Sequence, residues 1–516
     1  MKKRVLAIGL DGYEPSVAAR LMDEGGLPNL RNLARNSAVF ALDHGAAKRT
    51  GLAWEHVSLG KAPQDYGRHA AVRFDPATYG ASQFGTVQPP FLGDIAARCV
   101  IFDAPYFDLQ AAPNCQGLVS WGAHDAGVKQ HAVPAGLAQE IEARFGPYPA
   151  TPYIYGFVWP YKKRAKAMAE GLVRAVTLRG EIGRWLLAER LPDWDLALLV
   201  VSEFHSAIEA LWHGYDPAHP LHHLPSAAPA RLGVVGVYQA FDRMLGDYMH
   251  AFPDAELVLF SMHGMGANDS DVPTMLLLPE LLYRLSFGTR LFEPRADWAT
   301  TDVPMLGPKE RWSVAVRACM GPTGTGAEPA RLDWMPASLY RGFWPRMEAF
   351  ALPSYYDGRI RINLVGRERD GLVAAADYSR KLDELCDLLS ELRNPRTGAP
   401  VVRSAERPVA DDPLRADPTQ ADLVILWRDG PLAFYHDRLG LIGPAPYRRT
   451  GGHSGGHGIA YFTTPRLPCG NCGTASSFDV MPTLVELLGL RAPAELSGRS
   501  LLDRASRAAA VQSGLG

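Results

Sequence analysis

Apolar residues fall in short runs along this chain, and these runs alternate with longer segments of helical spacing. The runs predict buried strands over Val5–Leu10, Leu196–Val201, Leu257–Phe260 and Leu423–Trp427. Apolar residues spaced by three or four positions predict helices over Ile141–Phe145, Glu170–Leu187, Tyr378–Leu392 and Ser477–Leu490. Strands that alternate with helices predict an α/β fold, with a mostly parallel central sheet covered by helices on both faces.

The regular pattern weakens between residues 286 and 343. This segment is rich in Pro, Arg, Trp and Gly, and we interpret it as an insertion or cap over the functional site. Residues 1–285 and 344–516 are then expected to form the catalytic domain. We expect the insertion and the loop Trp121–Asp125 to influence which substrate is bound.

Composition narrows the function classes. The chain has 516 residues, 47% of them hydrophobic, and a net charge of −2, which gives no basic field for a nucleic-acid polymer. No stretch approaches 18 consecutive apolar residues, so we expect no membrane partner and a cytoplasmic protein. Six cysteines are too few for a disulfide framework. For Cys469 and Cys472 we favour a loop with two thiols over a redox pair.

Polar residues follow three of the predicted strands directly. Asp11 follows the first strand, Ser202 to His205 follow the second, and Ser261 to His263 follow the third. Because ligands gather at the carboxyl ends of the strands in such sheets, these residues are expected to meet at one edge.

Three further features carry possible metal ligands. His205 and Glu209 are four residues apart on a predicted helix, where they form either a ligand pair or an ordinary surface pair. His453 lies in a loop of glycines, and His263 is either a ligand or an interior histidine. Together with Asp11 these residues offer nitrogen and oxygen donors without a thiolate, which suits zinc or manganese and disfavours an iron–sulfur cluster.

Thr50 precedes a helical pattern from Leu52 to Leu59 that stops at Gly60. A hydroxyl at this position is either an N-cap or a group that attacks phosphorus when a metal lowers its pKa. Arg49, Glu55 and His56 are polar residues close to Thr50 in the sequence.

The residues described above lie in sequence segments that, in their order along the chain, resemble the alkaline phosphatase superfamily, specifically its type I phosphodiesterase/nucleotide pyrophosphatase branch. The resemblance covers most of the chain and rests on eight segments: VLAIGLDGYEP, LPNLRNLARNSAVF, RTGLAWEHVSLGKAPQDYG, SEFHSAIEALWHGYDPAHP, LVLFSMHGMG, GRIRINLVGRERDGLV, RTGGHSGGHGIAYF and FDVMPTLVELLGLRAPAELSGRSLL. It implies an alkaline-phosphatase-like fold and a phosphoryl group flanked by two metal ions, usually zinc.

The resemblance also assigns roles. Thr50 would be the nucleophile that becomes phosphorylated during hydrolysis of a phosphate diester or nucleotide pyrophosphate. Asp11, His263 and Thr50 would serve one ion, and His205, Glu209 and His453 the other. Arg49 and Trp54, beside Thr50, are expected to bind the substrate, a small phosphate ester or a nucleotide.

Two departures from the family pattern leave alternatives open. The family's Asp-x-x-x-His is His205-x-x-x-Glu209 here, which keeps one carboxylate and, with His453, two imidazoles. The family's Ser-Asp-His-Gly has Met262 in place of the aspartate, and a thioether is a poor zinc ligand. The alternatives are therefore a related group-transfer or other reaction at a one-metal site, or an inactive ligand-binding homologue.

Overall fold

The computed structural model describes residues 3–122, 129–153, 161–323, 332–408 and 412–503. Its largest sheet has nine strands, in the spatial order β19 (Gly470–Ser476), β2 (Ala38–Asp43), β18 (His457–Phe462), β9 (Ala255–His263), β1 (Arg4–Leu10), β8 (Leu196–Val201), β5 (Cys99–Phe102), β6 (Cys115–Val119) and β7 (His131–Val133). Only β18 and β7 run antiparallel to their neighbours. The prediction of a mostly parallel sheet is confirmed.

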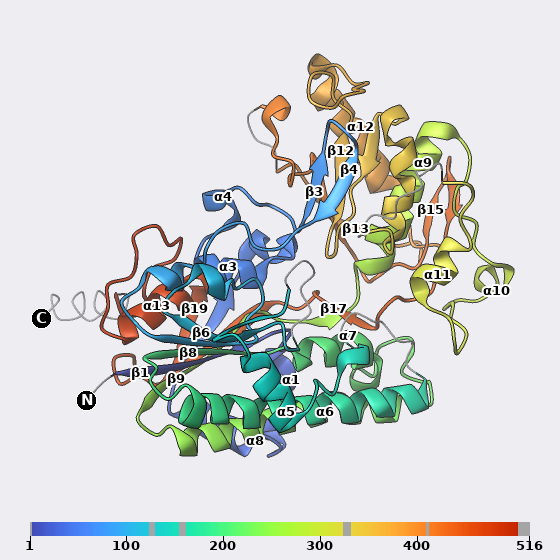
Figure 1. Ribbon diagram of the computed structural model, residues 1–516. Helices are drawn as coiled ribbons and strands as arrows, with labels where there is room; N and C mark the ends of the chain where they lie inside the picture. Colours follow the sequence, from blue (N-terminus) through green and yellow to red (C-terminus); the bar gives the residue numbers. More distant parts are fainter. Residues whose placement is uncertain (1–2, 123–128, 154–160, 324–331, 409–411, 504–516) are drawn as a thin grey trace, which may run out of the picture.

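Alternate residues of the central strands face opposite layers of helices. In β1, Leu6 and Ile8 join one apolar core, and Val5 and Ala7 join the other. Figure 1 shows these layers below and above the sheet. The first layer contains α1 (Pro15–Asp23), α2 (Pro28–Arg35), α5 (Leu137–Phe145), α6 (Lys162–Trp185), α7 (Glu203–Tyr215) and α8 (Ala227–Ala251); the second contains α3 (Ala53–Leu59) and α13 (Val480–Leu487).

A second lobe lies beside the central sheet, in the upper right of Figure 1. Its antiparallel sheet has the order β11 (Ala349–Ala351), β12 (Gly358–Ile362), β14 (Leu423–Trp427) and β13 (Val402–Glu406). Helices α9 (Leu278–Phe287), α11 (Trp312–Arg317) and α12 (Tyr378–Glu391) contribute to its core. The hairpin of β3 (Val72–Asp75) and β4 (Gly80–Gln83) reaches this core from the N-terminal part of the chain.

The strand expected at Leu423–Trp427 forms, but its assignment to the parallel sheet was wrong. It pairs antiparallel with β12 and β13. An apolar run shows that a strand is buried on both faces, and it does not show which sheet the strand joins.

The segment 286–343 contributes Trp298 and Trp312 to the core of the second lobe, together with residues on both sides of the segment. Its boundary as a separate insertion stays a prediction. Residues 324–331 of this segment and residues 123–125 of the loop Trp121–Asp125 lie outside the described ranges.

Other elements follow the predicted patterns with shifted ends. Helix α5 contains its predicted segment. Helix α6 ends two residues before Leu187, where a π-helical turn, Leu186–Arg190, follows it, and α12 ends one residue before Leu392. Helix α13 is shorter than expected because a 3-10 turn, Ser477–Asp479, precedes it. Cys472 lies in the edge strand β19 rather than in a loop, and both Cys469 and Cys472 are thiols. In the described part of the chain, no helix is long and apolar enough to cross a membrane.

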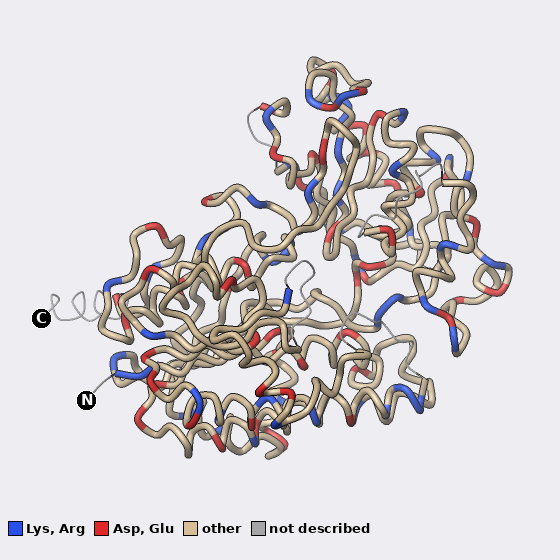
Figure 2. The backbone as a smooth tube through the Cα atoms, viewed as in Figure 1, with Lys and Arg blue, Asp and Glu red and all other residues tan. Residues whose placement is uncertain are grey.

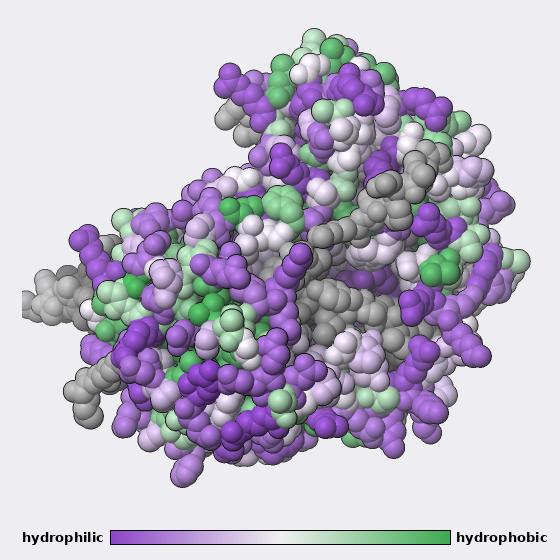
Figure 3. Space-filling view, in the orientation of Figure 1, coloured by the Kyte–Doolittle hydropathy of each residue, from purple (hydrophilic) through white to green (hydrophobic). Residues whose placement is uncertain are grey.

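The surface carries charges of both signs on both lobes, as Figure 2 shows. Polar residues cover most of the face in Figure 3, and this face is hollowed between the two lobes. The carboxyl ends of the central strands and the loops described below lie between the two lobes (Figure 1).

Candidate metal centre and nucleophile

The residues expected at the strand ends do converge. Strands β8 and β9 both pair with β1 in parallel register, so the three strands end at the same edge of the sheet. Asp11 follows β1, Ser202 connects β8 to α7, and His263 is the last residue of β9. The backbone N–H of His205 donates to the carbonyl of Asp11 across a 3.0 Å N–O distance, which fixes the first turn of α7 against the end of β1.

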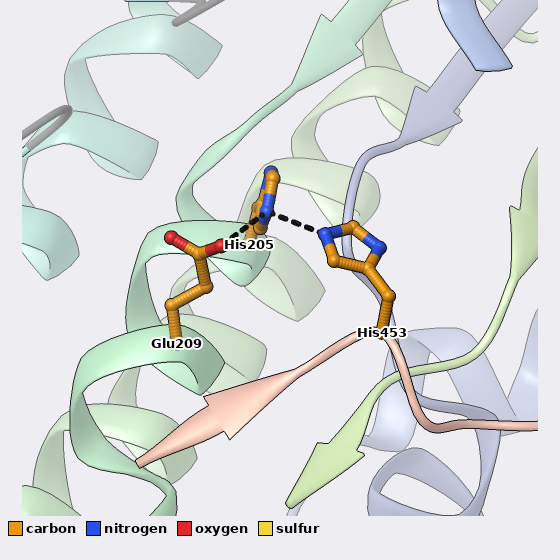
Figure 4. A group of neighbouring side chains, drawn as sticks. All are labelled: His205, Glu209 and His453. Atoms are coloured by element: carbon orange, nitrogen blue, oxygen red, sulfur yellow. Dashed lines mark hydrogen bonds and ion pairs between the residues drawn. The ribbon is translucent and has the colours of Figure 1, made fainter. Parts of the chain in front are cut away.

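Three side chains form a group that can hold a metal ion. His205 and Glu209 extend from successive turns of α7, and His453 approaches from the loop after β17 (Gly451–Gly452), as Figure 4 shows. Nε2 of His205 lies 3.0 Å from Oε1 of Glu209 and 3.0 Å from Nε2 of His453. One ligand atom from each residue lies within 4.8 Å of the others. Two imidazoles and a carboxylate are a ligand set that zinc uses in catalytic sites with an open position.

Asp11 orients His205 in this group. Oδ2 of Asp11 is 3.1 Å from Nδ1 of His205, so the carboxylate accepts the Nδ1 proton and leaves Nε2 for a metal. Gly12 makes the close approach possible, because a Cβ at this position would lie 2.3 Å from Cα of His205 and the residue has φ +70°. Asp11 therefore contacts His205, a proposed ligand of the ion expected at His205, Glu209 and His453, although the sequence suggested Asp11 only as a ligand of the ion next to Thr50.

The loop that carries His453 is anchored to α7. The backbone N–H of Thr450 donates to the carbonyl of Glu209 at 2.9 Å. Gly451 lies so close to the helix that a Cβ would be 2.1 Å from the carbonyl oxygen of Ile208. A side chain cannot fit there, which explains the glycine at position 451.

Arg449 is a site residue that the sequence did not single out. Its guanidinium forms ion pairs with Oε1 of Glu209 and with both carboxylate oxygens of Asp271, at 2.8 and 3.0 Å. Arg448 pairs with Asp271 as well, at 2.8 Å. The one available signal was the pair of arginines directly before the glycine loop, and it did not indicate which carboxylates they contact.

Thr50 lies at the end of a 3-10 turn, Gly45–Thr50, and is buried. Its hydroxyl donates to the carbonyl of Ala47 at 2.8 Å and accepts from the N–H of Leu52 at 3.1 Å. Helix α3 begins at Ala53, after Thr50 and the left-handed Gly51.

An aromatic side chain connects this turn to the metal group. A Cβ at Gly51 would lie 3.6 Å from the ring of Tyr356, and the rings of Tyr356 and His453 have centroids 3.9 Å apart. Thr50 is thus adjacent to a residue that touches Tyr356, and Tyr356 touches a proposed metal ligand. Tyr356 was not predicted, because it comes from the second lobe, whose position relative to the sheet the sequence does not indicate.

Four other residues close to Thr50 in sequence have structural partners. Trp54 is buried against Gly9 and Phe260, and its ring packs in the apolar core above the sheet. Arg49 makes two hydrogen bonds to Glu406, at 2.8 and 2.7 Å, and its role in substrate binding stays a prediction. Glu55 forms a buried ion pair with Arg68 at 2.7 Å. His56 bonds to His44 at 3.0 Å.

His263 lies between two other histidine rings. Its ring centroid is 5.1 Å from that of His453 and 6.3 Å from that of His44. Its Nδ1 is 3.0 Å from the carbonyl of Gly264, to which it donates. Burial lowers the pKa of His263, and the hydrogen bond to Gly264 and the charge of Asp11 oppose that effect. A neutral His263 keeps Nε2 as an acceptor or ligand.

The sequence matches no family model and no curated protein. Among solved structures, the chain is similar to phosphonoacetate hydrolase from Sinorhizobium meliloti 1021 in complex with phosphonoformate, at 14% identity and a TM-score of 0.53, with 94% of this chain and 96% of that chain covered. It is similar to the alkaline phosphatase PafA at 13% identity and a TM-score of 0.54, with 97% and 98% covered. Human ectonucleotide pyrophosphatase/phosphodiesterase 5 is similar at 12% identity and a TM-score of 0.47, with 95% and 96% covered.

Two of these structures, phosphonoacetate hydrolase and the alkaline phosphatase PafA, match with TM-scores above 0.5 and have the alkaline-phosphatase-like fold. The fold of this chain is therefore alkaline-phosphatase-like, as the resemblance in its sequence predicted.

Proposed function

We propose that this protein is a metal-dependent phosphoester hydrolase that acts on phosphate diesters or nucleotide pyrophosphates. The observation that carries the proposal is the group of His205, Glu209 and His453 at the carboxyl edge of the sheet, one aromatic ring away from the turn that ends at Thr50. The alkaline-phosphatase-like fold supports the same reaction class.

The ligand set fits zinc, and manganese is the alternative. An ion held by His205, Glu209 and His453 would act as a Lewis acid towards a phosphoryl oxygen. Asp11 would hold the imidazole of His205 in the tautomer that presents Nε2, and Arg449 would restrict the carboxylate of Glu209.

Thr50 is the proposed nucleophile. Its hydroxyl oxygen would form a bond to phosphorus as the bond to the leaving group breaks, and the hydroxyl proton would end on that leaving group, the alcohol of a diester or the phosphate of a pyrophosphate. Water would then hydrolyse the phospho-threonine and restore the hydroxyl. The hydrogen bonds to Ala47 and from Leu52 hold the side chain of Thr50 in one rotamer, which favours a fixed direction of attack.

The test uses two variants of the nucleophile. Thr50→Ala should lower kcat for bis(p-nitrophenyl) phosphate by about 10³-fold or more, while Thr50→Ser keeps a measurable part of it. Metal content measured by mass spectrometry should stay unchanged in both variants, which shows that the fold and the metal group are intact. Unchanged turnover in Thr50→Ala would refute the phospho-threonine route.

Met262 favours a second candidate function, transfer of the phosphoryl group to an acceptor other than water at a one-metal site. Product analysis in the presence of an added alcohol separates the two candidates, because transfer produces a new phosphate ester and hydrolysis does not. If a correctly folded, metal-loaded protein turns over no phosphate ester, the inactive ligand-binding homologue is the remaining interpretation.

A further inference from the structure

The donors available for a second metal ion do not fit zinc. Met262 is 5% exposed and packs in the apolar core with Trp54 and Phe260. A buried thioether is a soft, neutral group and cannot supply the charge of the carboxylate that the family pattern has at this position. The remaining donors are Asp11 and His263, together with the hydroxyl of Thr50.

These remaining donors are also engaged elsewhere. One oxygen of Asp11 accepts from Nδ1 of His205, and the hydroxyl of Thr50 donates to Ala47 and accepts from Leu52. The second site therefore lacks one carboxylate, and a phosphoryl group bound next to Thr50 would lack one of its two positive neighbours.

A lysine lies close to Thr50 in the sequence and near the end of β9 in the structure. Lys48 is in the same 3-10 turn as Thr50, two residues before it. Its Nζ donates to the carbonyl of Gly455 at 3.3 Å, and the next carbonyl of that loop, of Gly456, accepts from the N–H of Gly264 at 3.1 Å. The ammonium group is thus held by the loop that bonds to Gly264, the residue after the end of β9.

Lys48 has no compensating anion within ion-pair distance among the described residues, whereas the adjacent Arg49 is paired with Glu406. The lysine is partly buried, and the carboxylates that act on its charge, Asp269 and Asp43, lie beyond ion-pair distance. Its charge is therefore only partly compensated, and an anionic group bound there would be favourable. A phosphoryl group on or next to Thr50 would be such an anion.

We infer that this protein uses a single metal ion, and that the ammonium group of Lys48 supplies the positive charge that a second ion would otherwise supply to the phosphoryl group. An ammonium is a compact charge with three donors, so it can bond to a non-bridging phosphoryl oxygen while it retains Gly455. It stabilises the charge that develops on that oxygen in the transition state. This inference rests on the proposed function. It assigns to Lys48 the role that a second metal ion would otherwise have in the site.

The experiment combines metal content with phosphate binding. The wild-type protein, dialysed after incubation with excess zinc, should retain one ion per chain by mass spectrometry. Lys48→Met should retain one ion as well, but its Kd for inorganic phosphate, measured by calorimetry, should rise about ten- to a hundredfold. Lys48→Arg should recover part of that loss. Lys162→Met, on the exposed start of α6, is the matched control and should bind phosphate as the wild type does.

Two results would overturn the inference. One is a wild-type protein that retains two zinc ions per chain, and the other is a Lys48→Met variant with one ion and wild-type phosphate affinity. Neither result would refute the proposed function, which fails separately if Thr50→Ala keeps wild-type turnover.

Discussion

Nε2 of His205 and Nε2 of His453 lie 3.0 Å apart, although the two residues are separated by 248 positions in the sequence. Because Asp11 accepts the proton on Nδ1 of His205, Nε2 of a neutral His205 carries a lone pair. That lone pair faces a second imidazole nitrogen and a carboxylate oxygen of Glu209. The three ligand atoms lie close enough together to bind one metal ion.

Removal of either histidine should release the ion. We expect His453→Ala to lower zinc affinity by at least about 100-fold, because a three-ligand site keeps only two ligands. His457→Ala is the matched control, since His457 is an exposed histidine four residues further along. Competition with a fluorescent zinc chelator measures both affinities. Equal zinc affinity in His453→Ala and His457→Ala would contradict the assignment.

Asp11 should affect metal affinity through His205. Asp11→Asn removes the charged acceptor of the Nδ1 proton, and we expect zinc affinity to fall about 10- to 100-fold. The folded state should be retained, because the asparagine has nearly the same size and can still accept a hydrogen bond. Glu24→Gln, an exposed carboxylate paired only with Arg20, serves as the control. An unchanged zinc affinity would mean that Asp11 does not orient His205.

Arg179 is predicted to be the most costly ion-pair residue to replace. It is fully buried and pairs with Asp103 and Glu203, each at 2.8 Å. Arg179→Met leaves two buried carboxylates without a cation, which should lower the free energy of unfolding by about 3–5 kcal/mol. Arg190→Met breaks only the exposed pair with Glu140 and should cost at most about 1 kcal/mol. Urea unfolding of both variants tests the contrast, and similar losses would contradict it.

Stability should fall in mild acid partly because of His56. Burial lowers the pKa of His56 from 6.5 to about 3, and its Nε2 has no hydrogen-bond partner among the described residues. A folded pKa below the unfolded one means that the stabilisation is complete above pH 6.5 and is lost as the pH falls towards 3. The loss of unfolding free energy between pH 7 and pH 5 should therefore be about 1–2 kcal/mol smaller in His56→Gln than in the wild type. His223→Gln, at an exposed position, should keep the wild-type slope.

The sequence predicted the sheet and the metal group because both depend on local patterns. The runs at Val5–Leu10 and Leu196–Val201 became adjacent parallel strands, and the spacing of His205 and Glu209 placed both on one face of α7. His453 was identified through its neighbouring glycines, of which Gly451 lies in close contact with α7.

Contacts between distant segments could not be predicted in the same way. Leu423–Trp427 has the pattern of a buried strand, but its partners are set by tertiary packing, and it joined the antiparallel sheet. Tyr356 reaches the site from the second lobe and has no local signal. Arg449 belongs to the pair of arginines directly before the glycine loop, a pattern that does not indicate which carboxylates it contacts. Trp54 is only four positions after the expected nucleophile Thr50, yet its ring packs into the core.

The most direct test of the central claim is a zinc titration of chelator-treated protein, followed by hydrolysis of bis(p-nitrophenyl) phosphate. We expect no hydrolysis without metal, a linear return of activity that saturates at one zinc per chain, and no return in His453→Ala at the same zinc concentrations. Two results would contradict the assignment of a metal-dependent phosphoester hydrolase. One is hydrolysis that persists in the metal-free protein, and the other is a His453→Ala variant that hydrolyses the substrate at the wild-type rate after zinc is added.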